Sequence, residues 1–310
     1  MEIHAISGSW YSYRPAAVLK ITGQDAFLFL QGQFTQDLRS CVEGHDVAYG
    51  LWLNQKGKVL ADSFVLRVGM DWLVFSMFSA ATVLRERLET YIIADDVAIE
   101  DVTAQWAGVS VLGSDASEFL VGHAGLELHG DGSFTEKNGG FVFRGRRSKE
   151  PNWEWLYPVG TDDPASVLRG CGCTELSAAD MEQLRIRAEI PSVPRDIGPE
   201  DLPNEAGLEY DAISYSKGCY LGQEVMARLK TLGRVRRRLL RVTGPDAPPV
   251  VLPTPLFVDG KKVGELRSAV RTATGFVGLA MISLLGVTGR RLSSFSPESL
   301  AAIVITDAPA

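Results

Sequence analysis

The sequence predicts an α+β protein of two or three subdomains that ends in a β-rich unit. The chain has 310 residues, which exceeds the size at which a single hydrophobic core usually keeps growing. Before about residue 190, apolar residues recur at both helical and strand spacing, a pattern typical of α+β layers. From Val235 onward only strand-like segments and turns follow, which predicts a separate small barrel or sandwich.

The N-terminal part is predicted to contain two helices with strands between them. Thr22 and Asp25 form a capping-box pattern before a helix from roughly Gln24 to Leu38. Ser79 is expected to cap a second helix that runs to about Tyr91. The strands between the helices are predicted at Val47–Trp52, Val59–Val68 and Trp72–Phe78.

The middle part repeats this mixture. A strand, a short helix and a hairpin are predicted at Gly108–Leu112, Ser114–Val121, and Gly140–Arg146 paired with Trp153–Val159. Residues 146–152, between the hairpin arms, are expected to form an exposed loop. Ser177 and Asp180 form a second capping-box pattern, which predicts a helix to about Ala188, before Pro191.

A long irregular segment, Pro191 to Ser216, follows this helix and contains four prolines. Irregular stretches longer than about 12 to 15 residues are usually functional or disordered. The functional interpretation is favoured because the segment leads directly to a cysteine between two glycines.

That cysteine lies in Lys217-Gly218-Cys219-Tyr220-Leu221-Gly222-Gln223-Glu224. The glycines allow a close approach of the backbone to a ligand, and a nearby helix N-terminus and lysine would favour the thiolate. The alternative is that Cys219 is a small buried hydrophobic residue.

The cysteine motif and Leu202-Pro203-Asn204-Glu205-Ala206-Gly207-Leu208 together resemble the signature of the folate-binding YgfZ-type proteins. These proteins are relatives of the glycine cleavage system T-protein (aminomethyltransferase) and are tied to maturation or repair of iron-sulfur enzymes. Weaker matches extend the resemblance over most of the chain, at Phe29–Leu38, Leu53–Asp62, Val263–Ser268 and Gly278–Ala280.

The resemblance implies a three-subdomain cloverleaf with a tetrahydrofolate in its central hole. Residues 1–100 and 191–233 would form an α+β subdomain that carries the folate pocket and the Cys219 motif. Residues 101–190 would form a second α+β subdomain, and residues 234–310 a C-terminal β-barrel.

Two groups of site residues are implied by the resemblance. Cys219, with Lys217 beside it, would be the working thiol. The residues expected to contact the folate lie on or beside the matched motifs: Asn54, Asp62, Arg187, Glu205, Tyr220, Gln223, Glu224 and Arg228. Tyr220 is the first candidate for the flat slot of a pterin ring, with ordinary core packing as the alternative.

Two carboxylates bear on the chemistry. T-protein relatives carry paired acidic residues where this chain has Ala61 and Asp62. The loss of one carboxylate weakens the case for aminomethyl transfer, while Asp62 can still accept the hydrogen bonds of a pterin or face solvent. Glu205 is expected to bind a pterin, to pair with Arg187, or to start a helix. Glu189 stands where relatives often carry glycine.

Charge is distributed unevenly along the chain. The net charge of −7 argues against general nucleic-acid affinity, yet Lys217 to Arg241 contains eight basic residues and one acidic residue, a local net charge of +7. These residues are interpreted as charges that guard a strand edge, as attraction for the glutamate tail of a folate, or as an RNA contact.

Other site types are not favoured. Cys171 and Cys173 do not make the four-ligand pattern of a closed metal site, so a disulfide or plain surface thiols are expected there. No phosphate loop, dinucleotide fingerprint or serine-nucleophile elbow is present in the sequence. The low cysteine content and the lack of a targeting pattern predict a cytoplasmic protein.

Three functions remain open. The first is a folate-binding accessory protein for iron-sulfur enzymes, with those enzymes or assembly proteins as partners. The second is a folate-dependent aminomethyltransferase or demethylase of the T-protein type. The third is an RNA-associated binding module that uses the basic residues between Lys217 and Arg241.

Overall fold

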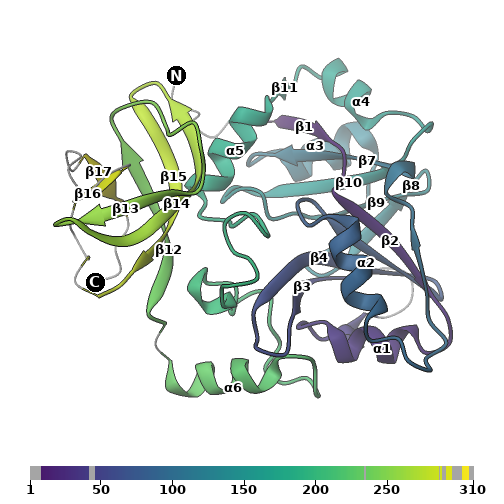
Figure 1. Cartoon of the computed structure of the whole chain (residues 1–310). Coiled ribbons are helices and arrows are strands. Elements are labelled where there is room, and N and C mark those ends of the chain that lie inside the picture. Colours follow the sequence, from purple (N-terminus) through teal and green to yellow (C-terminus); the bar gives the residue numbers. More distant parts are fainter. Residues whose placement is uncertain are drawn as a thin grey trace.

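The computed structural model describes residues 8–41, 46–233, 235–285, 287, 291–294 and 302–306. These residues form two open sheets with flanking helices and one closed barrel. The barrel lies to one side of the two sheets, and the irregular segment after residue 190 runs between the barrel and the sheets (Figure 1). The predicted α+β class with a C-terminal β-barrel is confirmed.

The first open sheet has five strands in the order β3-β4-β5-β2-β6. All neighbouring strands in it are antiparallel. Two helices pack on one face, where Leu30, Trp52, Val65 and Leu84 are fully buried. The elements are β2 (Ala17–Thr22), α1 (Ala26–Gln33), β3 (Val47–Leu53), β4 (Val59–Val68), β5 (Asp71–Ser76), α2 (Ala81–Glu89) and β6 (Ala98–Asp101), with a 3-10 turn at Leu38–Ser40.

The second open sheet has six strands in the order β11-β1-β7-β10-β9-β8. One face of this second sheet packs against the face of the first sheet that the helices leave free. The contact is an aromatic cluster that includes Phe64 and Phe75 of the first sheet and Phe143 of the second. The elements are β1 (Ser9–Tyr13), β7 (Trp106–Leu112), α3 (Ala116–Ala124), β8 (Phe134–Lys137), β9 (Gly140–Arg144), β10 (Asn152–Pro158), α4 (Pro164–Gly170) and β11 (Thr174–Glu175), with a 3-10 turn at Thr103–Gln105.

Two helices connect these sheets to the barrel: α5 (Ala178–Arg187) and α6 (Gln223–Leu232). Between them, residues 191–222 have one short 3-10 turn, Pro203–Glu205. The segment is nevertheless well packed, because Val193, Ile197 and Leu208 are buried against residues of β3 and β4. The prediction of an irregular stretch is therefore confirmed, and its apolar residues hold it on the first sheet.

The closed barrel has the strand order β12-β15-β14-β13-β16-β17. Apolar side chains such as Val242, Leu266 and Ala280 fill its interior. The strands are β12 (Arg237–Gly244), β13 (Thr254–Val258), β14 (Lys261–Thr272), β15 (Gly275–Ser283), β16 (Arg291–Ser294) and β17 (Ile303–Ile305).

Two of the three predicted helix caps are wrong. Thr22 is the last residue of β2, and Asp25 precedes α1 without a side-chain cap; its carboxylate instead accepts a hydrogen bond from the backbone N–H of Asp96. Ser79 also does not cap α2, because its hydroxyl is used inside the sheet. The third cap is confirmed, since Ser177 forms a complete capping box at the start of α5.

Glu189, which stands where relatives often carry glycine, lies just after the end of α5. Glu189 adopts a φ of +60°, the left-handed conformation that favours glycine. Its backbone N–H donates to the carbonyl of Ile186, and that of Ile190 donates to the carbonyl of Arg185. Glu189 thus makes the helix-ending turn that a glycine would make, so the chain path toward residue 190 does not depend on that glycine.

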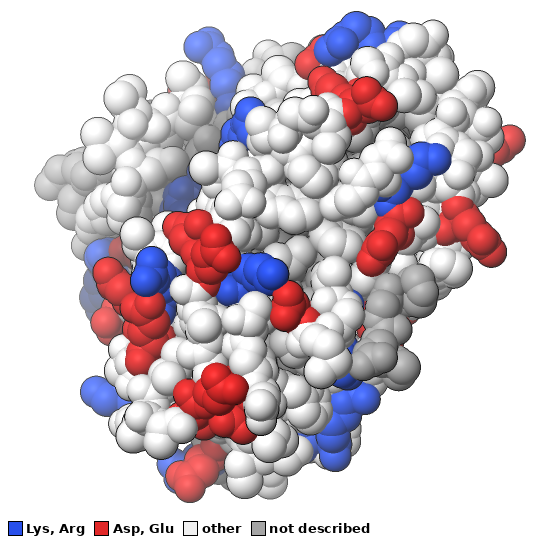
Figure 2. Space-filling model, turned by 90° about the vertical axis from the view of Figure 1, so that its right-hand side faces the viewer, with Lys and Arg blue, Asp and Glu red and all other residues white. Residues whose placement is uncertain are grey.

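Acidic and basic side chains are interspersed on the face of the molecule drawn in Figure 2. None of the helices in the described ranges has the length and apolar character needed to span a bilayer.

Candidate functional site

Asp62 lies in the middle of β4, at the centre of a buried polar network. Its side chain is only 7% exposed. Oδ1 accepts hydrogen bonds from the hydroxyls of Ser79 (2.8 Å) and Ser76 (3.3 Å), and Oδ2 accepts one from the hydroxyl of Tyr49 (3.0 Å). Burial raises the pKa of Asp62. The carboxylate is thus fixed in orientation, and it does not face bulk solvent as the alternative interpretation held.

Two arginines reach this region from the loop between β9 and β10, which was expected to be exposed. The Arg146 guanidinium lies 3.9 Å from the ring centroid of Tyr49 and 2.6 Å from a carboxylate oxygen of Asp211. Arg147 is 6% exposed and lies 4.1 Å from the ring centroid of Tyr13. The expectation was wrong for these two residues because aromatic faces and a carboxylate draw their guanidinium groups inward.

Two adjoining pockets open beside this network. The smaller one has a volume of only about 10 Å³, and residues that include Asp62, Arg146 and Pro191 line it. The larger one has a volume of about 510 Å³, within the range of roughly 300–1,000 Å³ that is usual for small-molecule sites. Phe78 lines both pockets. The lining of the larger pocket includes Tyr11, Phe78, Arg147, Glu182, Arg185 and Ser192.

Arg185 holds the wall of the larger pocket together. Its side chain is 2% exposed. Its guanidinium donates to carboxylate oxygens of Asp196 (2.6 Å) and Glu182 (2.7 Å) and to the hydroxyl of Ser268 (3.1 Å). Helix α5, the irregular segment and barrel strand β14 therefore meet at one side chain. Sequence analysis singled out Arg187 and overlooked Arg185.

Cys219 lies on the exposed loop before α6, and it does not line either pocket. Lys217, two residues before it, is buried, and its ammonium donates to the backbone carbonyls of Gln31 (2.8 Å), Phe34 (2.6 Å) and Gln36 (2.9 Å). Burial lowers the pKa of Lys217 to about 8, so the amine is still charged at pH 7. Because it binds the end of α1, Lys217 positions the loop of the thiol.

The rest of the cysteine motif also fixes this loop. Tyr220 is buried in the core between β3 and the irregular segment. Gly222 has a φ of +86°, and a Cβ atom there would lie 2.9 Å from the carbonyl oxygen of Asn54. Asn54 in turn accepts backbone hydrogen bonds from Lys56 and Lys58 with its side-chain oxygen. The glycine thus serves the packing of the α6 N-terminus on the β3–β4 hairpin, while Cys219 stays exposed.

The remaining predicted residues are spread over the molecule. Gln223, Glu224 and Arg228 lie on the first two turns of α6, and the last two are exposed. Glu205 pairs with Arg237 (2.9 Å) and does not pair with Arg187. Its carboxylate also accepts the backbone N–H of Leu202, so it stabilises the turn of its own motif.

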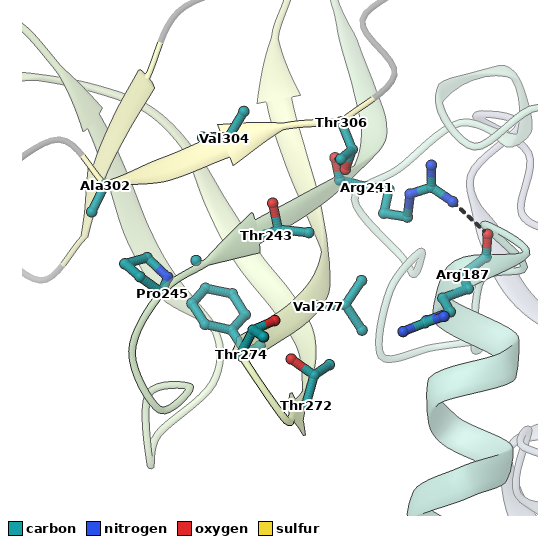
Figure 3. Close-up of a pocket in the computed structure, with 12 residues that line it drawn as sticks. Arg187, Arg241, Thr243, Pro245, Thr272, Thr274, Val277, Ala302, Val304 and Thr306 are labelled. Carbon is teal, nitrogen blue, oxygen red and sulfur yellow. Dashed lines mark hydrogen bonds between the residues drawn. The ribbon is translucent and has the colours of Figure 1, made fainter. Parts of the chain in front are cut away.

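Arg187 lines a groove of about 660 Å³ on the outside of the barrel. Figure 3 shows its carbonyl oxygen accepting a hydrogen bond from Arg241 (2.8 Å), at the junction of α5 and β12. This groove is separate from the pockets beside Asp62.

The basic residues between Lys217 and Arg241 do not form one patch. Arg237 binds Asp201 and Glu205, and Arg241 binds the carbonyl of Arg187. Arg234 lies outside the described residues. Arg237 therefore joins the barrel to the irregular segment and Arg241 joins it to α5, an interpretation that sequence analysis did not consider.

The four cysteine thiols are all free in the part of the chain that the structure describes. No group of three or more His, Cys, Asp or Glu side chains in that part is placed to hold a metal ion.

Comparison with known proteins places this fold. Residues 14–130 match the family model described as the GCVT N-terminal domain. The crystal structure of the glycine cleavage system aminomethyltransferase T from Bartonella henselae superposes with a TM-score of 0.80 at 18% identity, over 98% of this chain and 86% of that one. The architecture is therefore that of the aminomethyltransferase T-protein, as the resemblance implied.

Relatives in sequence narrow the class further. The chain is 28% identical to the human iron-sulfur cluster assembly factor IBA57, mitochondrial, over 96% of this chain and 85% of that protein. It is 28% identical to the tRNA-modifying protein YgfZ of Vibrio vulnificus strain YJ016, over 74% and 69%. A putative chloroplastic transferase of Arabidopsis thaliana, At1g60990, is also 28% identical, and the match covers 85% of this chain but only 62% of that protein. The chain is thus similar to relatives of the T-protein of the YgfZ and IBA57 type, which confirms the predicted resemblance.

Proposed function

We propose that this protein binds a folate and acts as an accessory factor in the assembly or repair of iron-sulfur enzymes. The observation that carries the proposal is the fixed, buried carboxylate of Asp62, which lines a small cavity that shares Phe78 with a pocket of ligand size in a T-protein fold. The names of the human and Vibrio relatives support the iron-sulfur part and a link to tRNA modification. The cytoplasm remains the predicted compartment.

The residues beside Asp62 fit a folate. Phe78 and Tyr11 offer apolar faces to a flat ring, and Arg195, which is 48% exposed, offers a cation for a carboxylate tail at the pocket mouth. Asp62 has about four acceptor positions, and three hydroxyls use three of them. The remaining position would accept a ring N–H and orient the ring. A bound tetrahydrofolate would supply a reduced nitrogen that carries one-carbon units.

Cys219 would be the point of contact with the iron-sulfur partner. Its thiol is exposed while Lys217 and Gly222 on either side are held by neighbouring elements. A thiolate is a good ligand for iron-sulfur clusters, and a rigid loop lowers the entropic cost of presenting it to a partner. In the proposal the cluster is cargo shared with an assembly protein or a client enzyme.

Replacing Cys219 with serine should abolish this function without unfolding the protein. We expect a strain that lacks its own YgfZ-type protein to regain the activity of its iron-sulfur enzymes with the wild-type chain and to regain almost none with Cys219→Ser. Cys171→Ser is the matched control, because Cys171 is also exposed and lies elsewhere, and it should restore activity fully. Full restoration by Cys219→Ser would remove the thiol from the proposal.

A second candidate function is one-carbon transfer of the T-protein type. It is favoured by the fold and by the position of Asp62 beside the pocket, and it is weakened by Ala61, which leaves one carboxylate at the matched pair. Folate-dependent turnover of a methylamine-type substrate that is lost in Asp62→Asn would favour this function over the first.

A further inference from the structure

A further pocket lies between the irregular segment and α6. Its volume is about 530 Å³. It shares no lining residue with the pockets beside Asp62. The residues that matter for its chemistry are Asn204, Glu209, Tyr210, Tyr215, Lys230 and Arg238; together with the other lining residues they are called the Asn204 pocket below.

Two hydrogen-bond acceptors in this pocket are left without donors. Oδ1 of Asn204 and Oε2 of Glu209 are both shielded from solvent, and neither of these two atoms has a hydrogen-bond partner within the described ranges, although the Asn204 side chain also acts on the Glu209 carboxylate as a hydrogen-bond donor. A buried polar atom without a partner destabilises the protein, because its hydrogen bond to water is lost and not replaced. Burial also raises the pKa of Glu209. A ligand N–H that donates to Oε2 of Glu209 would relieve one of these costs, and a further N–H that donates to Oδ1 of Asn204 would relieve the other.

Aromatic and cationic groups complete the pocket. The Tyr215 ring lies 4.3 Å from the Lys230 ammonium, and Tyr210 is 81% exposed at the pocket. Arg238 provides a second cation. The pocket therefore combines acceptors, flat apolar faces for a ring and positive charge for an anionic substituent.

We propose that the Asn204 pocket binds a ring that carries an N–H and an amino group side by side, with an anionic substituent held by Lys230 and Arg238. Guanine and pterins share this edge. A carboxylate accepts both donors of the edge at once, since each of its oxygens has acceptor capacity. Adenine offers an acceptor beside its amino group, so one carboxylate oxygen of Glu209 would face another acceptor instead of a donor. Tyr210 or Tyr215 would stack on the ring, as aromatic side chains do on nucleobases.

The proposal is tested by calorimetric titration of the full chain with GMP, AMP and folic acid. We expect GMP to bind at one site at least tenfold more tightly than AMP, because a correct two-point edge contact discriminates by about 1–3 kcal/mol. Glu209→Gln, which replaces an acceptor oxygen with an amide donor, should weaken GMP tenfold or more. Lys230→Ala should weaken it several-fold and reduce its salt dependence, while the exposed Lys56→Ala should change nothing.

The arms of the experiment separate the possible sources of the ring. Folic acid that displaces GMP and is weakened by Glu209→Gln would assign a pterin as the natural ligand, and GMP binding without competition would assign a guanine nucleotide. Equal affinity for AMP and GMP would overturn the proposal. So would unchanged GMP binding in Glu209→Gln, or no binding of GMP or folic acid at millimolar concentration. Asp62→Asn in parallel shows whether folic acid occupies the other site, so failure here is distinguishable from failure of the proposed function.

Discussion

Replacing Arg185 with methionine should lower the free energy of unfolding by about 3–5 kcal/mol, the cost of breaking a buried ion pair from one side. Asp196 is fully buried and would lose the guanidinium 2.6 Å away. The hydroxyl of Ser268 on the barrel would lose a donor as well. Because Arg185 also lines the larger pocket, folate binding should weaken together with stability. Urea denaturation at pH 7 measures the loss.

Arg195→Met is the matched control for this prediction. Arg195 contacts the same carboxylate of Glu182 at 2.6 Å, but its side chain is 48% exposed. Exposed ion pairs contribute about 0–1 kcal/mol, so this variant should be close to wild type in stability. If the two variants lost the same free energy of unfolding, the burial of Arg185 would not explain its contribution to stability.

Replacing Lys217 with methionine should destabilise the protein by about 3 kcal/mol, because hydrogen bonds to a buried charged group are worth about 1.5–3 kcal/mol each and are not independent of one another. The carbonyls of Gln31, Phe34 and Gln36 would lose a shared donor. The loop of Cys219 would also lose its attachment to α1. We therefore expect faster amide hydrogen exchange in residues 217–222 than in wild type, in addition to the lower stability.

Lys56→Met serves as its control, since Lys56 is exposed on the β3–β4 turn. It should leave both stability and hydrogen exchange of the loop unchanged. A Lys217→Met protein as stable as wild type, with altered thiol reactivity alone, would instead support the sequence-based view that Lys217 acts on the thiolate.

The elements predicted best are those whose signals are local. Strand β4 has the predicted bounds, Val59–Val68, and the Ser177 capping box lies where the sequence places it. Ser79 shows the limit of such signals. A hydroxyl before a helical pattern predicts a cap, yet the buried carboxylate of Asp62, 17 residues away along the chain, is a stronger partner for it.

Contacts between distant segments explain what the sequence could not predict. Lys217 and Cys219 are neighbours in sequence, which suggested activation of the thiol, but the lysine reaches back to α1, more than 180 residues earlier. Arg146 and Arg147 are typical loop residues by pattern, and only the packing of two sheets brings them to Tyr49 and Tyr13. The role of Arg185 in the wall of the larger pocket depends on Asp196 and Ser268, which the fold brings beside it from the irregular segment and from the barrel.

The central claim is that a folate binds beside Asp62, and anaerobic calorimetric titration with tetrahydrofolate tests it most directly. The account predicts one saturable site in wild type and at least tenfold weaker binding in Asp62→Asn, which removes a charge-assisted hydrogen bond worth about 1.5–3 kcal/mol. Cys219→Ser should bind as wild type does, because the thiol does not line the pocket. No binding at millimolar ligand, or binding that Asp62→Asn leaves unchanged, would contradict the account.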